Sequence, residues 1–484
     1  MMRFLSGRWS AASGVLAILC AAQLMLIIDV VVVNVALPAI KTDLAIPDAR
    51  LTFASVAYTL AFGSLLIVAG RAGDLFGRRR LLLAGLAVFT LGSLLSGAAQ
   101  TDWQLFAARA GQGLGAAAIS PNALALIATT FAEGSERNRA LGFWGAVGSA
   151  GAIAGQLLGG LITALVGWRW IFLINVPIGI VAFVIALRLL PESRGTERPR
   201  LDLGGAVGLA GGLAMLTYAL SRLPGGEVEA GFALTVAVAL ALLIAFVTIE
   251  RRHPAPIVRF GLLGNGFVRA GNAVLALSAA AVGGALFFTS LYLQLVLGYS
   301  PLTVGLAFAP VTLIVLVVSP FAGRLVDRFG VRRMLAAGMT LVAAGLLSLA
   351  RVPAEGNPFT DVLPGLAVVA LGSGLSYAPA FIAGTTGVAE SEQGLASGLL
   401  NTAQELGAAI GLALLGALAA AGGAASVTAG YRTGFLGAFV LAALAVVAVA
   451  RMRPQPGTTE AIPRNDCSLG NADGAGTACV AEAA

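Results

Sequence analysis

Three ionisable residues, Asp29, Arg109 and Glu405, lie inside long apolar stretches of the sequence. A charge in the hydrocarbon region of a membrane costs about 2.5–3.5 kcal/mol on insertion scales, so such residues are candidates for function. A carboxylate beside a cation favours its ionised form, and one that loses the cation in apolar surroundings favours the protonated form. These residue types therefore point to reversible proton binding.

Asp29 and Arg109 each lie about 6 or 7 residues from the outer end of a predicted helix, which is roughly 10 Å at 1.5 Å per residue. The two side chains therefore share a depth, and neighbouring helices would bring them together as a proton switch. The alternative is a permanent structural ion pair. Gln112 and Gly113 follow Arg109 at helical spacing, so one face carries a charge, an amide and a close-packing point.

Glu405 lies about 10 residues inside its predicted helix, roughly 15 Å from the cytoplasmic end and near the bilayer midplane. It either binds a cationic group or stays protonated and hydrogen-bonded to a neighbouring helix. With Glu405, five amides are candidates for a substrate cavity, although each amide is equally compatible with bridging between helices. These amides are Asn34, Gln112, Gln156, Gln294 and Asn401.

The elements that must position these residues are membrane helices. Hydrophobic residues make up 58% of the 484-residue chain and charged residues 11%, with a mean hydropathy of +0.91. A spanning helix needs about 20 mostly apolar residues, whereas a membrane β-barrel would show alternation in shorter segments. We therefore predict an all-α membrane fold with fourteen spans, at 13–36, 51–70, 81–99, 103–131, 140–165, 168–190, 203–222, 231–249, 270–296, 302–323, 334–350, 363–388, 395–422 and 432–450.

The 30 basic residues fix the predicted orientation, because Lys and Arg of short loops stay on the cytoplasmic side. Most of them fall in alternate loops, which places both termini in the cytoplasm. The predicted parts are a cytoplasmic N-terminus (1–12), a six-helix bundle (13–190), a linker with two inserted helices (191–269), a second six-helix bundle (270–451) and a disordered cytoplasmic tail (452–484). We predict a multi-pass protein of a bacterial cytoplasmic membrane that works as a monomer.

An internal repeat relates the two bundles. The run GRAGDLFGRRR at residues 70–80 recurs as GRLVDRFGVRR at residues 323–333, each after the second helix of a bundle. One such run is compatible with a positively charged turn, but two in register favour a conformational latch between repeated halves. The predicted latch residues are Gly70, Asp74, Gly77, Arg78, Arg79, Gly323, Asp327, Gly330 and Arg332.

With these residues the chain resembles the major facilitator superfamily, and specifically its fourteen-helix drug:proton antiporter branch. The run at 70–80 is similar to the superfamily's signature between its second and third helices. Residues 29–38 (DVVVVNVALP) resemble the first-helix motif of the drug antiporters, and residues 168–179 (WRWIFLINVPIG) the sixth-helix motif of this branch. The resemblance implies two six-helix bundles with two inserted helices, and covers almost the whole chain.

Two further stretches, in the fourth and fifth predicted helices, also resemble motifs of the family. Residues 109–115 (RAGQGLG) resemble the fourth-helix motif, in which the family assigns proton transfer to the position of Arg109. The fifth-helix antiporter motif is altered, because Gln156 stands where the family has proline, so the proline-dependent bend is not carried over. Its glycines retain the spacing for close helix packing. They are Gly151, Gly155, Gly159 and Gly160.

The sequence contains no residue pattern that indicates an enzyme active site. The single histidine, His253, falls in a predicted loop, and no metal-ligand spacing or phosphate-binding glycine loop is present. We therefore predict no catalytic residues, no metal, no cofactor and no nucleic-acid partner, with the proton gradient as energy source. The predicted function is proton-coupled export of amphipathic, drug-like or antibiotic-like molecules. Proton-linked uptake, lipid transport and a transport-inactive receptor or scaffold of the same fold remain alternatives.

Overall fold

The computed structural model describes residues 7–47, 50, 53–191, 202–222, 230–251, 253, 256–299, 301–423 and 426–452, except for some side chains within these ranges. Residues 1–453 form one compact unit. Of the predicted tail at 452–484, all but Met452 lies outside the described residues, and so does the whole of the loop at 192–201.

Every regular element of the described residues is helical. The first half contains α1 (Gly7–Asp43), α3 (Phe53–Phe76), α4 (Arg78–Ala98), α5 (Asp102–Thr130), α6 (Ser135–Val166), α7 (Trp170–Leu173) and α8 (Asn175–Leu189). The inserted pair is α9 (Leu203–Arg222) and α10 (Ala230–Glu250), followed by the short helix η2 (Phe260–Gly264). The second half contains α11 (Gly266–Leu291), η3 (Tyr292–Val296), α12 (Pro301–Phe329), α13 (Val331–Leu349), η4 (Pro358–Val362), α14 (Leu363–Thr385), η5 (Glu390–Glu392), α15 (Gln393–Gly422) and α16 (Val427–Ala450).

Twelve helical segments of the described residues are long and apolar enough to cross a membrane. Each predicted span overlaps a helix, but α6 is not among the twelve and α9 is apolar over the shorter stretch 204–219. The all-helical membrane fold is therefore confirmed, and the predicted count of fourteen is not. Helix α1 also begins at Gly7 and ends at Asp43, beyond both ends of the predicted span 13–36.

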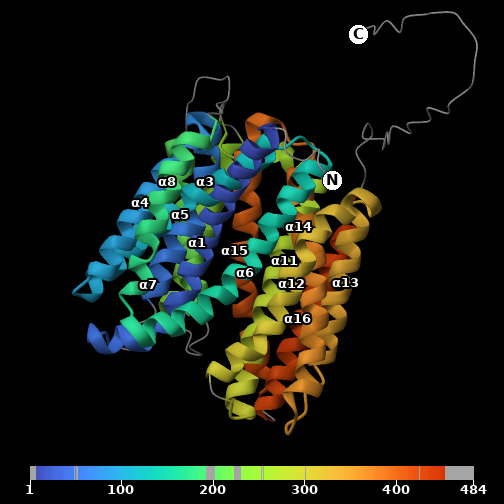
Figure 1. Ribbon diagram of the computed structural model, residues 1–484. Coiled ribbons are helices and arrows are strands. Elements are labelled where there is room, and N and C mark those ends of the chain that lie inside the picture. Colours follow the sequence, from blue (N-terminus) through green and yellow to red (C-terminus); the bar gives the residue numbers. More distant parts are fainter. Residues whose placement is uncertain are drawn as a thin grey trace, which may run out of the picture. The chain divides into compact units, whose positions relative to one another are not determined.

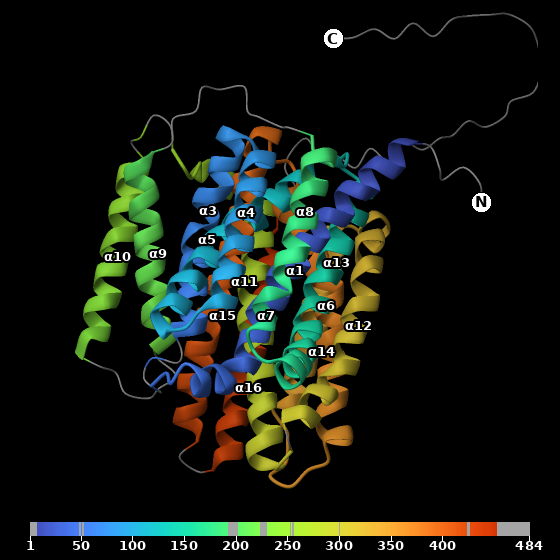
Figure 2. The ribbon, with the colours of Figure 1, turned by 60° about the vertical axis from the view of Figure 1, so that its left-hand side comes forward.

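The two halves meet through four main helix pairs. Helix α3 packs on α15 and α6 packs on α12, and α5 also contacts α15 and α6 also contacts α14. Figure 1 shows most of the blue-to-cyan helices on one side and most of the yellow-to-red helices on the other. The inserted helices α9 and α10 lie at the outer edge of the first half in Figure 2, where α9 packs on α3 and also reaches α15.

The repeated runs at 70–80 and 323–333 form equivalent turns, α3–α4 and α12–α13. Gly77 has a φ of 108° and Gly330 a φ of 79°. This left-handed region favours glycine, since it has no Cβ to clash with the backbone. Both turns lie where the halves touch, and we call this end of the bundle the signature end.

Candidate functional site

A buried polar network in the first half is centred on Asp29. The Arg109 guanidinium donates to Asp29 Oδ2 at 2.5 Å, and Gln112 and Asn175 donate to Asp29 Oδ1 at 3.0 and 2.9 Å. Asp29 and Arg109 are each 1% exposed. The carboxylate thus accepts three hydrogen bonds and is neutralised by one guanidinium.

Helix α4 holds the amide of Gln112 in place. Gln112 Nε2 also donates to Ser93 Oγ at 2.8 Å, and Ser96 Oγ donates to Gln112 Oε1 at 3.1 Å. Arg109 donates to the same oxygen at 2.9 Å. Both polar groups of the amide are therefore saturated, which fixes its orientation between Asp29 and Arg109.

Aromatic rings and a backbone carbonyl surround the rest of Arg109. Its guanidinium carbon lies 4.4 Å from the ring centre of Tyr58 and 5.6 Å from that of Phe172, and its Nε donates to the Ala54 carbonyl at 3.1 Å. Cation–π contacts of this kind stabilise a desolvated cation. The sequence predicted that Asp29 and Arg109 share a depth; in the structure they touch, and helices α1, α3, α4, α5, α7 and α8 all contribute to their surroundings.

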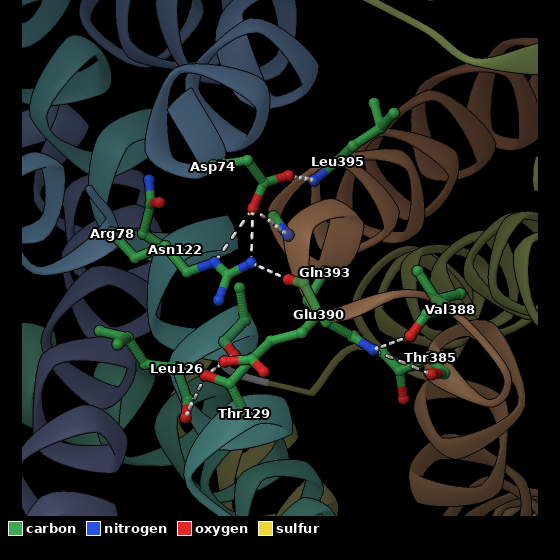
Figure 3. Close-up of polar contacts among 12 residues, drawn as sticks. Asp74, Arg78, Asn122, Leu126, Thr129, Thr385, Val388, Glu390, Gln393 and Leu395 are labelled. Atoms are coloured by element: carbon green, nitrogen blue, oxygen red, sulfur yellow. Dashed lines mark hydrogen bonds and ion pairs between the residues drawn. The ribbon is translucent and has the colours of Figure 1, made fainter. Parts of the chain in front are cut away.

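At the signature end, Asp74 joins the halves. Its carboxylate accepts hydrogen bonds from the backbone N–H groups of Gly394 and Leu395, both at 2.9 Å, at the start of α15 (Figure 3). Arg78 donates to Asp74 Oδ1 at 3.0 and 2.8 Å and also to the Glu390 carbonyl. A carboxylate on the first N–H groups of a helix is stabilised by the helix dipole.

Glycine backbones allow this close approach. A Cβ added at Gly70 would collide with the Gly394 carbonyl oxygen, and one at Gly323 would collide with the Asn138 carbonyl oxygen. Asp327 accepts a hydrogen bond from Asn138 Nδ2 at 2.5 Å, so the second copy also links the halves. The two copies differ in burial, because Asp74 is 3% exposed whereas Asp327 is exposed.

Two other predicted latch residues, Arg79 and Arg332, lie in different copies of the repeat. Arg79 donates to the Leu187 carbonyl of α8, and Arg332 donates to the Ala450 carbonyl at the end of α16, so each bonds within its own half. In the fifth-helix motif, Gly151, Gly155 and Gly159 face α1 closely enough that an added Cβ would press on its side chains or backbone. Gly160 is half-buried.

A cavity of about 770 Å³ lies mainly in the second half. Helices α11, α12 and α14 form most of its lining, with Gly148 of α6 and Gln404 of α15. Within this lining, Tyr377 donates to Gln404 Oε1 at 3.0 Å, and its ring lies against Gly145 and Gly148. The cavity is thus mostly apolar, with hydroxyl and amide groups as its polar features.

The predicted cavity residues are not gathered there. Asn401 accepts from Ser120 Oγ and donates to the Ser397 carbonyl, and Gln294 donates to Ser290. Neither lines the cavity, and neither does Glu405. Gln112 belongs to the Asp29 network, and the side chains of Asn34 and Gln156 lie outside the described residues.

Glu405 has no hydrogen bond or ion pair with any described residue, and it lies within electrostatic range of Tyr58 and Tyr377.

The sequence did not reveal Ser93, Ser96 and Asn175 as members of the network around Asp29 and Gln112. It also did not reveal Tyr377 and Gln404 as residues of the cavity. The position of Asn175 in the sixth-helix motif was the one available signal.

At the opposite end of the first half, Asp43 accepts hydrogen bonds from Arg169 at 2.5 Å and from the Trp168 indole at 3.1 Å. The bond from Arg169, followed by that from Trp168, lowers the pKa of the Asp43 carboxyl. For a bound metal, no group of three or more His, Cys, Asp or Glu side chains within the described ranges is suitably placed.

Comparison with protein families decides the relationship. The model of the Major Facilitator Superfamily matches residues 19–411 and, in a second match, 271–473. The chain belongs to the major facilitator superfamily. Its fold agrees: the structure of the proton:xylose symporter XylE superposes with a TM-score of 0.66 at 16% identity, covering 92% of this chain and 96% of that one. The human organic anion transporter MFSD10 gives the same TM-score at 15% identity, covering 92% and 100%.

Curated relatives are closer in sequence. The puromycin resistance protein of Streptomyces alboniger is 40% identical over 83% of this chain and 80% of its own length. The cephamycin export protein CmcT of Amycolatopsis lactamdurans is 39% identical over 93% of each chain, and the lincomycin resistance protein of Streptomyces lincolnensis 35% over 82% of each. Together with the apolar helices, these relatives indicate a bacterial membrane protein of a transporter superfamily.

Proposed function

We propose that this protein is a proton-driven antiporter that exports small amphipathic, drug-like or antibiotic-like molecules from the bacterial cytoplasm. Relatives at 35–40% identity named for antibiotic resistance or export support the substrate class and the direction. The observation that carries the coupling proposal is the buried Asp29–Arg109 pair, since ionisable groups inside a membrane are costly to bury and mark ion or proton pathways.

The proposed proton step uses the geometry around Asp29. In the arrangement with the signature end closed, three donors stabilise the ionised carboxylate. A rearrangement that separates Arg109 from Asp29 leaves a carboxylate in apolar surroundings, which favours uptake of a proton. Return of Arg109 expels that proton on the other side of the membrane. No bound cofactor is required, because the proton gradient supplies the energy.

The 770 Å³ cavity is the proposed substrate site. Its rings, Phe287 and Phe308, offer apolar contact, and Tyr377 and Gln404 offer hydrogen bonds near the bilayer midplane. A site of this kind recognises a substrate by shape and a few polar groups. It lies apart from Asp29, so proton and substrate occupy different halves.

We further propose fourteen spans with both termini cytoplasmic, which adds α6 and α9 to the twelve apolar segments, and a functional monomer. The signature end then faces the cytoplasm. Single cysteines at Glu227 and Arg198, both outside the described residues, test this topology. An impermeant maleimide applied to intact cells should label the first and not the second; labelling of both, or the reverse pattern, would contradict the proposal.

A resistance screen tests the function itself. Expression in a bacterial host that lacks its own pumps should raise tolerance to some members of a panel of cationic, neutral and anionic compounds. Everted membrane vesicles should then accumulate an active compound when a pH gradient is imposed, and collapse of the gradient should stop accumulation. Tolerance without any dependence on the gradient would remove proton coupling, and no tolerance to any compound would remove drug export.

A further inference from the structure

The inserted helices contact both halves at one seam. Helix α9 packs on α3 of the first half and on α15 of the second, and α3 and α15 themselves form the contact that carries Asp74. Helix α10 packs on α9 and is joined to α11 by residues 251–265. A change in the distance between the halves would therefore alter the contacts of the insertion.

A buried carboxylate shapes the segment after α10. Glu250, the last residue of α10, is 2% exposed, and its Oε1 accepts the Val258 N–H at 2.7 Å. This bond turns the chain back against the helices. Ile257, Val258 and Leu262 are consequently buried, with exposures of 1%, 5% and 9%.

The buried segment completes an apolar cluster at the seam. Besides Ile257, Val258 and Leu262, this cluster contains Leu209, Leu213 and Phe246 of the inserted pair, Ile67 of α3, and Leu395 of α15. Leu395 also donates its N–H to Asp74. The residue that the first-half carboxylate binds is thus held from its other side by the insertion.

An ion pair reaches the same helix start. Arg259 Nη1 lies 2.8 Å from Glu392 Oε1, and the Glu392 side chain is 13% exposed. Glu392 immediately precedes α15, two residues after Glu390, whose carbonyl accepts from Arg78. Basic side chains from the first half and from the insertion therefore hold residues 390–395 together.

We propose that Glu250 and residues 256–264 form a cytoplasmic clasp, through which the inserted helices hold the start of α15 in position for Asp74 and so stabilise the arrangement with the cytoplasmic side closed. Arg259 is a positioning residue in this clasp. The inference rests on the proposed orientation and on alternation between two arrangements, and not on which compound is carried.

Spin labels at the exposed positions Leu189 and Arg451, at the cytoplasmic ends of α8 and α16, report the separation of the halves in nanodiscs. Partly exposed ion pairs have modest energies, so Arg259→Glu should raise the ratio of open to closed populations about 1.5- to 5-fold. Arg259→Gln should give a smaller change in the same direction and should fold even where the reversal does not.

The double variant Arg259→Glu/Glu392→Arg restores the opposite charges and should return the distance distribution to that of the wild type. Arg188→Glu is the matched control, because Arg188 is an exposed arginine on the same proposed side of the membrane, at the end of α8. It should leave the populations unchanged. Arg259→Glu and Arg259→Gln both behaving like this control, or no restoration in the double variant, would overturn the clasp. Neither measurement requires transport, so failure of the drug-export proposal would be seen separately.

Discussion

The two copies of the repeated loop should contribute unequally to the stability of the closed arrangement. Comparison of Asp74→Asn with Asp327→Asn tests this difference. Asp74 is buried, binds two backbone N–H groups of α15 and pairs with Arg78. Removing one partner of a buried pair costs about 3–5 kcal/mol. Asparagine keeps one acceptor oxygen, so we expect the closed arrangement to lose about 2–4 kcal/mol.

Such a loss would reduce the closed population relative to the open one by about 30- to 700-fold. Asp327→Asn is the matched control, since Asp327 is exposed and accepts a hydrogen bond from Asn138. An exposed contact contributes less than about 1 kcal/mol, so its loss should change the closed population relative to the open one less than about fivefold. The absence of an arginine at Val331, the position equivalent to Arg78, adds to the asymmetry.

Efflux of ethidium from cells and the label distance between Leu189 and Arg451 check this prediction. Asp74→Asn should slow the initial efflux rate at least tenfold at unchanged membrane abundance and shift the distance toward the open arrangement. Asp327→Asn should reduce the rate mildly. Equal losses in the two variants would refute the argument from burial, and full activity in both would mean that the loops serve topology alone.

Three other predictions address the charged groups. Asp29→Asn should abolish uphill efflux in vesicles with an imposed pH gradient while probe binding survives, because an amide cannot exchange a proton; unchanged uphill efflux would remove Asp29 from the mechanism. Glu405→Gln should weaken export of cations such as ethidium and spare neutral compounds, measured as a ratio of resistance levels; equal loss for both classes would point to a structural or coupling role. Arg169→Gln should lower the Tm of the purified protein at neutral pH, because Arg169 lowers the pKa of Asp43 and the ionised pair stabilises the fold above the ordinary pKa of an aspartate. That contribution disappears as the pH falls through the folded-state pKa, so the Tm difference from the wild type should narrow in acid; a difference independent of pH would assign the effect to packing.

The helical membrane fold could be predicted from the sequence, because the length of the apolar stretches and the repeat at 70–80 and 323–333 are visible along the chain without knowledge of its three-dimensional structure. The shared depth of Asp29 and Arg109 could also be predicted from their positions in the apolar stretches, and the family resemblance implied that their helices are neighbours. The count of spans was harder, because α9 is apolar over only part of its length.

The details of the sites depended on helix rotation. Gln404 lines the cavity and its neighbour Glu405 does not, although they are adjacent in sequence. Successive helical residues point about 100° apart, and no pattern in a uniformly apolar helix states which direction faces the cavity. Asn175 and Ser93 were missed for a related reason: small polar residues on separate helices share no spacing that would join them to Asp29.

The three hydrogen bonds to Asp29 bear on how well an exporter of this design prevents proton leakage. A carboxylate that accepts no hydrogen bonds could take up a proton at little cost and release it on either side, which would be a leak. Here Arg109, Gln112 and Asn175 donate to it from two other helices. Withdrawal of those donors favours protonation, so in the proposed cycle protonation is coupled to helix movement, and the bonds that stabilise the resting bundle also disfavour turnover without cargo.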